Sequence, residues 1–415
     1  MGIAGASAAV LAALSAFGAP QAAAPELVLL GRIRQRMAED LARLPNYTCL
    51  ETIERSVRRA PDRELAFRDR VRLEIAFIGR KELFAWPESG RFEERLLTEL
   101  ITAGSFGTGN FGLHVHNVFL TSAPVFSYAG EQLRDGRRTH HYDFRFPLLS
   151  SAATVRVRQT EGRVGQCGSF WVDAETLDLL RLEVHADEIP PNLDCSRASD
   201  IMEYGRGPLG AGDFLLPRSA ELIMADLAGT ESRNLVRFSQ CRQYATESSI
   251  RFEEAPGATA PARPSAEVKL PPYLELEMRL ETPVDAETAA VGDPIRARLR
   301  REVKLPGGVS IAKGAIVYGR IRRLEQYFKP AQFMVGFEFF AAELGGGRAV
   351  FSAHLTGPRR VQAPGAWGPG LGRGAPVVTG LDIDESAPRP GIGAFLVLGS
   401  RLQLRPGLRM VWETR

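Results

Sequence analysis

The sequence predicts a mainly β protein in two parts. The first is a series of half-buried strands opened by an amphipathic helix, and the second is an all-β sandwich or small barrel. Apolar and charged residues alternate along many short segments, as in strands with one buried face. One stretch near the start instead repeats every three to four residues, as an amphipathic helix does. A Pro- and Ala-rich linker at 255–272 separates the two groups of strands.

Length and composition indicate a folded protein of two domains. The 415 residues exceed what one hydrophobic core usually serves. The chain is 44% hydrophobic and 24% charged, with a net charge of +3, so nothing points to nucleic acid or an anionic membrane as a partner. Only five of the 52 basic residues are lysines, a skew that GC-rich codons explain more simply than phosphate recognition.

Residues 1–24 are predicted to be a signal peptide. They carry no charged side chain and run apolar from Ile3 to Phe17. That core is shorter than the roughly 20 residues of a spanning helix and is followed by small residues. We expect cleavage after Gly18 or Ala24, a periplasmic or secreted bacterial protein, and no integral membrane span after signal removal. The lack of Lys or Arg before the apolar run fits a start codon further upstream.

The first part is predicted over residues 25–254. A helix opens it and ends at Pro45, with a buried stripe of Leu30, Ile33, Met37, Leu41 and Leu44. Alternation then predicts strands at 48–56, 67–78, 139–146, 153–159, 169–173, 177–186, 201–204, 218–226 and 234–244. Residues 88–101 have a helical pattern, residues 104–112 form a Gly-rich loop, and residues 114–120 look extended.

Two segments of this region carry a family resemblance. They are the hairpin from Phe170 to Leu182 and the strand and turn from Leu216 to Gly229. They resemble the LolA/LolB-like lipoprotein carriers, including the related domain of RseB, over about residues 26–254. The resemblance implies an antiparallel half-barrel, which is a curved antiparallel sheet with an N-terminal helix packed against it and further helices that plug its concave face.

Residues 273–415 are predicted to form the second domain. Its strands are expected at 274–280, 294–303, 315–324, 332–343, 348–355, 395–404 and 408–414, with no helix between them. The phrases at 291–295 and 311–321 resemble the β-barrel of TrbI/VirB10-type envelope proteins. Residues 357–392 are rich in Gly and Pro and are predicted to be a mobile loop.

Cys49, Cys167, Cys195 and Cys241 are an even set in an exported protein, which predicts two disulfide bonds. Three pairings are possible. Cys167 opens a hairpin whose second strand leads into the loop with Cys195, so that local pair is favoured and Cys49 is left with Cys241. A zinc site is the alternative, but no CxxC motif occurs and no histidine lies at ligand spacing.

Gly107, Gly109 and Gly112 match the GxGxxG pattern of dinucleotide-binding loops. That fingerprint needs a strand before it and a helix after it, so that the pyrophosphate meets a helix N-terminus. The expected order here is the reverse. We therefore interpret the segment as a loop, in which Phe106 and Phe111 are placed to gate the mouth of an apolar cavity.

Two further patterns are weighed as catalytic or metal sites. The tetrapeptide at 310–313 matches the SxxK of penicillin-interacting serine enzymes, but its end reads as a turn. His114 and His116 would share one side of a strand, a geometry that chelates metals when a third ligand is present. His140 and His141 are adjacent and point to opposite faces. We expect no catalytic site, no metal and no cofactor.

Two hypotheses for function remain. The first is an exported, non-enzymatic binding protein that holds a lipid, an acyl chain or an apolar segment in its concave sheet. The second is an envelope scaffolding or protein-interaction module whose half-barrel is filled by its own side chains. A hydrophobic ligand or an envelope protein is the expected partner, and the oligomeric state is left open. The candidate ligand-binding residues are aromatic: Phe77, Phe84, Trp86, Phe106, Phe111, Phe119, Phe126 and Trp171.

Overall fold

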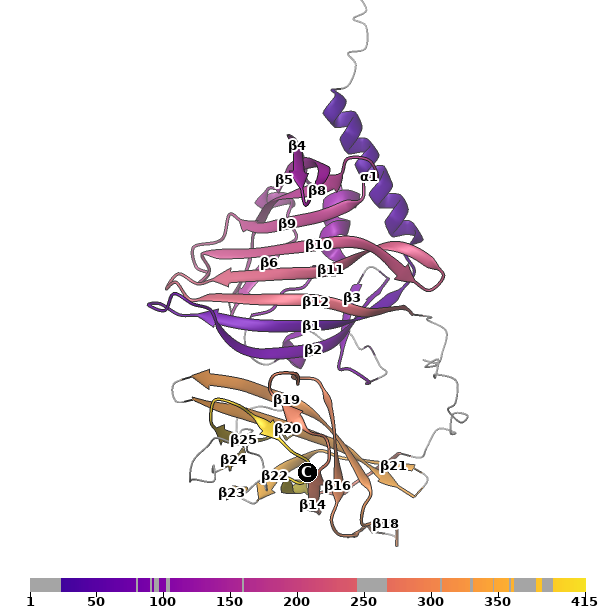
Figure 1. Ribbon diagram of the computed structural model, residues 1–415, viewed down its shortest axis with the longest axis vertical. Coiled ribbons are helices and arrows are strands. Elements are labelled where there is room, and N and C mark those ends of the chain that lie inside the picture. The colour runs from indigo at the N-terminus through magenta and orange to yellow at the C-terminus, as the bar shows by residue number, and fades with distance from the viewer. Residues whose placement is uncertain are drawn as a thin grey trace, which may run out of the picture.

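The structure is a computed structural model. It describes residues 24–415 except 80, 90–91, 93–96, 102–104, 159, 245–266, 307, 329–330, 346, 358–359, 362–377 and 383–390. The predicted signal peptide up to residue 23, much of the predicted linker and most of the predicted mobile loop lie outside the described residues. The described part of the chain folds into two large sheets, drawn one above the other in Figure 1.

The first sheet has ten strands, all antiparallel, in the order β3-β2-β1-β12-β11-β10-β9-β8-β5-β4. Its strands are β1 (Tyr47–Arg58), β2 (Ala66–Ile78), β3 (Lys81–Ala85), β4 (Val125–Arg134), β5 (Arg137–Phe146), β8 (Gly165–Asp173), β9 (Leu179–Asp187), β10 (Arg197–Leu209), β11 (Gly212–Ala225) and β12 (Glu231–Gln243). A separate hairpin consists of β6 (Thr154–Val157) and β7 (Thr160–Arg163). The predicted mainly β class and the antiparallel half-barrel are confirmed.

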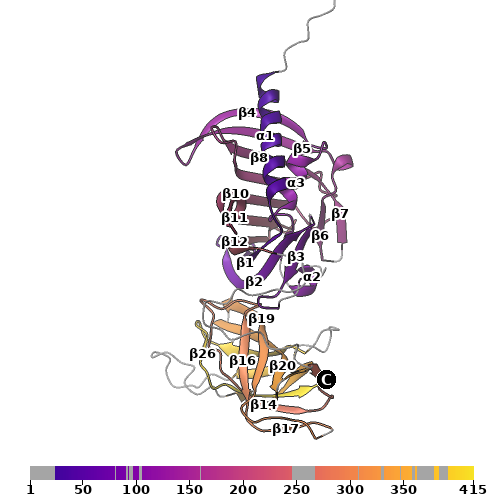
Figure 2. The same cartoon turned by 90° about the vertical axis from the view of Figure 1, so that its right-hand side faces the viewer.

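The helices of this part are α1 (Pro25–Arg43), α2 (Leu97–Leu100), α3 (Leu113–Leu120) and the 3-10 helix η1 (Leu148–Ser150). Figure 2 shows α1 and α3 side by side within the curve of the first sheet. The predicted stripe of α1 faces that sheet, with Leu30, Ile33 and Met37 buried. Tyr142 of β5 donates a hydrogen bond of 2.7 Å to the carbonyl of Glu26, which fixes the start of α1. None of the described helices is both long and apolar enough to cross a bilayer.

The prediction that residues 114–120 are extended is wrong, because α3 is a helix. Arg34 of α1 donates to the carbonyl oxygens of Phe119 and Thr121 at 3.0 and 2.7 Å, at the C-terminal end of α3. At the N-terminal end of α3, a carboxylate from β3 accepts hydrogen bonds from backbone N–H groups. Both stabilising contacts come from distant segments, so local alternation could not report them.

The second sheet contains β22 (Ala353–Gly357), β27 (Arg409–Thr414), β14 (Glu275–Leu280), β16 (Pro294–Leu299), β19 (Ile316–Phe328), β20 (Ala331–Leu344), β25 (Gly393–Leu398), β24 (Val378–Asp382) and β23 (Arg360–Val361), in that order. Off this path lie β21 (Gly347–Val350), which pairs with β20, and β13 (Glu267–Lys269), which pairs with β21. Two short ladders are β15 (Val284–Asp285) with β26 (Gln403–Leu404) and β17 (Val303–Lys304) with β18 (Ser310–Ile311).

This sheet curls back on itself. A Cβ added to Gly393 of β25 would lie 2.4 Å from Leu355 of β22 and 2.5 Å from Trp412 of β27. Strands distant in the ladder order are therefore packed against each other, and Trp412 is fully buried between them. The second all-β unit is confirmed.

The two sheets are joined through the free edge of β2. β3 pairs only with the end of β2, from Glu74 to Ile78. Val291 occupies the unpaired edge: its carbonyl accepts from the Arg72 N–H at 2.8 Å, and its N–H donates to the carbonyl of Arg70 at 2.8 Å. An ion pair of 2.5 Å between Arg72 and Asp293 adds to this contact.

The cysteine predictions are half right. Cys49 of β1 and Cys241 of β12 form a disulfide bond, as expected. Cys167 and Cys195 are free, so the favoured local pair is wrong. Cys167 lies in β8 opposite His185 of β9, and Cys195 precedes β10 on the far side of β9. β9 therefore lies between Cys167 and the strand into which Cys195 leads, so the hairpin does not pair the two thiols.

Candidate functional site

The concave face of the first sheet is covered by α1, by α3 and by residues 105–112. We call α3 with residues 105–112 the plug. Phe111 is 1% exposed and packs against Tyr47 of β1 and Phe238 of β12, with ring centroids 4.8 and 5.2 Å apart. Phe119 packs edge-on against Phe170 of β8 at 4.9 Å. The plug thus fills the half-barrel with aromatic side chains.

The structure brings several of the predicted aromatic residues together on this face. Phe126 packs on Phe170 at 6.1 Å, beside Phe119. Phe77 lies against the start of α3, where a Cβ on Gly112 would be 2.8 Å from its ring. Phe111 is the most deeply buried aromatic side chain of residues 105–112, whereas Phe106 is half-buried and packs against the same core.

Other predicted residues lie elsewhere. Trp171 is on the convex face, because its neighbour Phe170 points into the core and adjacent strand residues point oppositely. It stacks on His141 at 4.4 Å. Trp86 faces the second sheet, with the Arg322 guanidinium 5.0 Å from its ring centroid. Phe84 is buried in β3.

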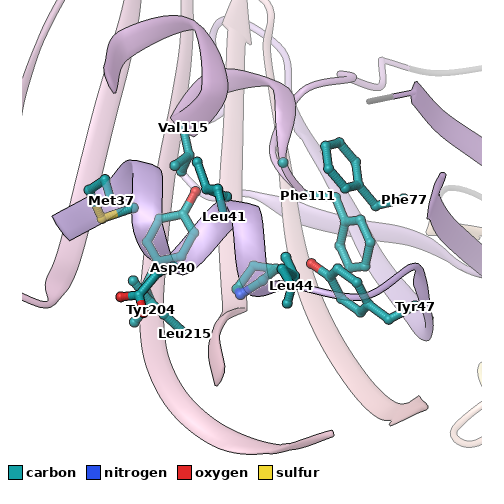
Figure 3. Close-up of a pocket in the computed structure, with 12 residues that line it drawn as sticks. Met37, Asp40, Leu41, Leu44, Tyr47, Phe77, Phe111, Val115, Tyr204 and Leu215 are labelled. Atoms are coloured by element: carbon teal, nitrogen blue, oxygen red, sulfur yellow. The ribbon is translucent and has the colours of Figure 1, made fainter. Parts of the chain in front are cut away.

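A small cavity lies where α1, the plug and the sheet meet (Figure 3). Its volume is about 20 Å³, which is room for roughly one water molecule. Most of the lining side chains are aliphatic or aromatic, among them Met37, Leu41, Leu44, Phe77, Val115 and Leu215. The concave face is therefore filled in this conformation. The cavity lies at the contact between α1 and the plug, and we call this contact the seam.

The polar centre of the site is Glu82 of β3. Its carboxylate accepts the backbone N–H groups of Gly109, Phe111, Gly112 and Leu113 at 2.7, 3.1, 2.9 and 3.3 Å. These donors surround the N-terminus of α3, where the helix dipole favours a negative charge. The GxGxxG loop is thus followed by a helix after all, and an internal carboxylate occupies its anion position.

Buried hydroxyl and carboxyl groups lie next to this centre. Glu51 of β1 is 3% exposed, and its Oε2 has no hydrogen-bond partner among the described residues. Burial, reinforced by the charge of Glu82, raises the pKa of Glu51 to about 8, so it is protonated at neutral pH. The hydroxyl of Tyr204 is likewise without a partner in the described part of the chain, and burial raises its pKa well above the ordinary value.

The histidines do not form the chelating pair that a strand would have produced. His114 and His116 are two residues apart on a helix, so they point in different directions. His114 Nε2 lies 3.3 Å from Asp200 Oδ2. Within the described ranges, no group of three or more His, Cys, Asp or Glu side chains is arranged to hold a metal ion. Lys313 lies in a turn after β18, as the sequence predicted.

A second cavity, of about 380 Å³, lies between the two sheets. Its walls combine apolar side chains with charged and polar ones, and some of the latter are paired: Arg70 contacts Glu54 at 2.8 Å, and Gln403 donates to Asp285 at 3.0 Å. Such walls do not suit an apolar chain, so the seam between α1 and the plug is the better candidate for the predicted ligand.

No protein-family model matches the chain, and no curated protein matches it. A solved DUF1329 family protein from Desulfovibrio piger is similar with a TM-score of 0.31 and 13% identity, over 53% of this chain and 94% of that one. A domain described as an outer membrane lipoprotein-sorting protein, from Vibrio parahaemolyticus, gives a TM-score of 0.26 and 12% identity, over 51% and 92%. Because both TM-scores are low, neither structure supports the half-barrel assignment, which rests on the strand order of the first sheet.

Proposed function

We propose that this protein is an exported, non-enzymatic binding protein that holds an apolar chain, such as the acyl chain of a lipid or an apolar peptide segment, in its concave sheet. The observation that carries the proposal is the apolar cavity between α1, the plug and the sheet. Its walls come from elements far apart in sequence, so a shift of any one of them enlarges it. The space so opened is lined by side chains that suit an apolar ligand.

Binding requires the plug to move, because the closed cavity accepts about one water molecule. The polar contacts of the plug are the two hydrogen bonds from Arg34, the four backbone N–H groups on Glu82, His114 beside Asp200 at 3.3 Å, and Asn234 donating to the carbonyl of Ser105 at 2.7 Å. Each net hydrogen bond contributes about 1 kcal/mol. A chain of about twelve methylenes contributes up to about 10 kcal/mol on burial at about 0.8 kcal/mol each. Ligand burial is therefore of the same size as the polar contacts, and the buried plug side chains Phe111 and Phe119 have to keep apolar cover in the open form.

An envelope location accords with the covalent structure. The Cys49–Cys241 disulfide bond joins adjacent strands, and such bonds persist in the periplasm and outside the cell. We therefore place the mature protein in the periplasm or outside the cell, with a hydrophobic ligand as its partner.

The test is chain binding by variants that change the cavity in opposite directions. Val115→Ala enlarges the cavity and Val115→Leu fills it, since one methylene has about the volume available. We expect the affinity for N-phenyl-1-naphthylamine, measured by fluorescence, to rise with the first change and fall with the second. Asn117→Leu, an exposed position of the same helix, is the matched control.

The filled interior also favours the alternative, an envelope scaffolding module with no small ligand. Native mass spectrometry of protein taken from its host envelope separates the two. A co-purifying lipid mass supports the binding protein. A bare protein mass, together with no dye binding by any Val115 variant, contradicts it and favours the scaffold.

A further inference from the structure

The N-terminus of α3 directs its backbone hydrogen-bond donors to one acceptor. Four backbone N–H groups converge on the single carboxylate of Glu82. Beside them, the Tyr204 hydroxyl and the buried Glu51 Oε2 have no partner among the described residues. Unsatisfied buried polar groups are uncommon in folded proteins and call for an explanation.

These donors and the apolar cavity are parts of one site. Gly112, whose N–H binds Glu82, also lines the cavity, as do Phe111, Tyr47 and Tyr204. Glu51 lies on the inner face of β1 opposite Phe238, which packs on Phe111, so it sits directly beneath the loop. The site therefore has a polar end made of donors and an apolar end formed with α1.

We propose that the N-terminus of α3 is the head-group site of an anionic, single-chain amphiphile. Its carboxylate or phosphate takes the place of Glu82 on the four N–H groups while its chain enters the seam between α1 and the plug. This inference rests on the proposed function and names its ligand class. In the closed form, the Glu82 carboxylate then occupies the position that the charged group of the ligand takes when it binds.

The placement of Glu82 allows this exchange. It is the second residue of β3, which is the edge strand of the sheet, and its side chain is only half-buried. It can turn toward water without leaving a buried charge. Once it leaves, the protonated Glu51 and the Tyr204 hydroxyl are free to donate to the incoming anion. Two other carboxylates lie near the site. Asp200 Oδ2 is 3.3 Å from His114, whereas its Oδ1 has no partner among the described residues; Asp40 of α1 lines the cavity and pairs with Arg206 at 3.0 Å.

The glycines of the loop serve this geometry. Gly109 has a φ of +106°, which a side chain would strain, and a Cβ there would lie 2.9 Å from His114. The apolar wall distinguishes the site from a dinucleotide pocket, since a ribose and a base would meet aliphatic side chains. Anion recognition by the loop and chain recognition by the seam together define an amphiphile.

The experiment compares dodecanoate, dodecyl phosphate and methyl dodecanoate by isothermal titration calorimetry on the full-length protein. We expect both anions to bind at least tenfold more tightly than the ester, and the ratio between them identifies the preferred head group. Glu82→Gln removes the competing charge and weakens the cap that holds the plug, so it should tighten anion binding about fivefold more than it tightens ester binding. Tyr204→Phe should weaken anion binding about fivefold relative to ester binding. Glu275→Gln, an exposed carboxylate of the second sheet, controls for net charge.

The outcomes separate the two proposals. Equal binding of ester and anions, unaffected by Glu82→Gln, overturns the head-group site and leaves the apolar-chain function standing. No binding of any of the three compounds overturns both. If Glu82→Gln loses the far-UV circular dichroism of the parent, Tyr204→Phe decides alone, because it does not touch the cap of α3. An unchanged anion preference in Tyr204→Phe then counts against the site.

Discussion

Glu51→Gln tests the buried carboxyl group beneath the plug. Glu51 is 3% exposed, and its pKa is raised from the ordinary value of 4.5 to about 8, first by burial and then by the charge of Glu82. Between these pH values the folded protein holds a proton that the unfolded chain releases. The free energy of unfolding therefore falls as pH rises from about 4.5 to about 8.

The magnitude follows from the same shift. One pKa unit corresponds to about 1.4 kcal/mol, and pH 7 lies about 2.5 pH units above the ordinary pKa, so the penalty there is about 3 kcal/mol. Below pH 4.5 it vanishes, because both states are protonated. Glu51→Gln keeps the shape but cannot ionise. The variant should be more stable than the parent by up to about 3 kcal/mol at pH 7, and no more stable than it at pH 4.

Urea unfolding followed by circular dichroism, at pH 4 to 9 with the disulfide intact, measures this difference. Glu54→Gln, on the outward face of the same strand, is the control and should not reproduce the pH profile. Parallel pH profiles for the parent and Glu51→Gln would refute the reasoning, because the Glu51 carboxyl would then titrate alike in both states.

Three other predictions concern the joints of the fold. Replacing Cys49 and Cys241 by Ser removes a covalent link across 192 residues. The loop-entropy relation predicts that the free energy of unfolding, measured with urea, falls by up to about 5 kcal/mol, and a fall below about 1 kcal/mol would contradict it. Arg34→Ala removes both hydrogen bonds to the end of α3 and should speed amide hydrogen exchange there at least tenfold, with exchange in β19 as the internal control. Trp86→Ala removes the ring that the guanidinium groups of Arg320 and Arg322 contact from the second sheet. Because this weakens the contact between the sheets, we expect faster proteolysis between them, and an unchanged cleavage rate would argue against the contact.

Sequence patterns predicted the parts of the fold that short-range periodicity specifies. The stripe of α1 and the alternation of β2 were correct, because burial of one face imposes a period of 3.6 or 2 on the residues themselves. β3 and β4 were not predicted. β4 is an edge strand with mostly exposed residues, so its side chains carry no alternation of burial.

The candidate site was only partly predictable. Phe111 and Phe119 were named from their aromatic character and do fill the concave face, whereas Trp171 lies on the convex face because of its register in β8. Glu82 was missed. No local signal marks it, since its partners begin 27 residues later and are backbone N–H groups, which every residue has.

By itself, the sequence determined the class of the protein: mainly β, opened by a helix, with an internal break rich in proline. Tertiary structure alone decided that residues 113–120 are helical, that Cys167 stays unpaired and that a carboxylate closes the glycine loop. The reason is physical. Periodicity records which face of an element is buried, but caps, disulfide bonds and anion sites depend on which distant groups the folded chain brings within about 3 Å of each other.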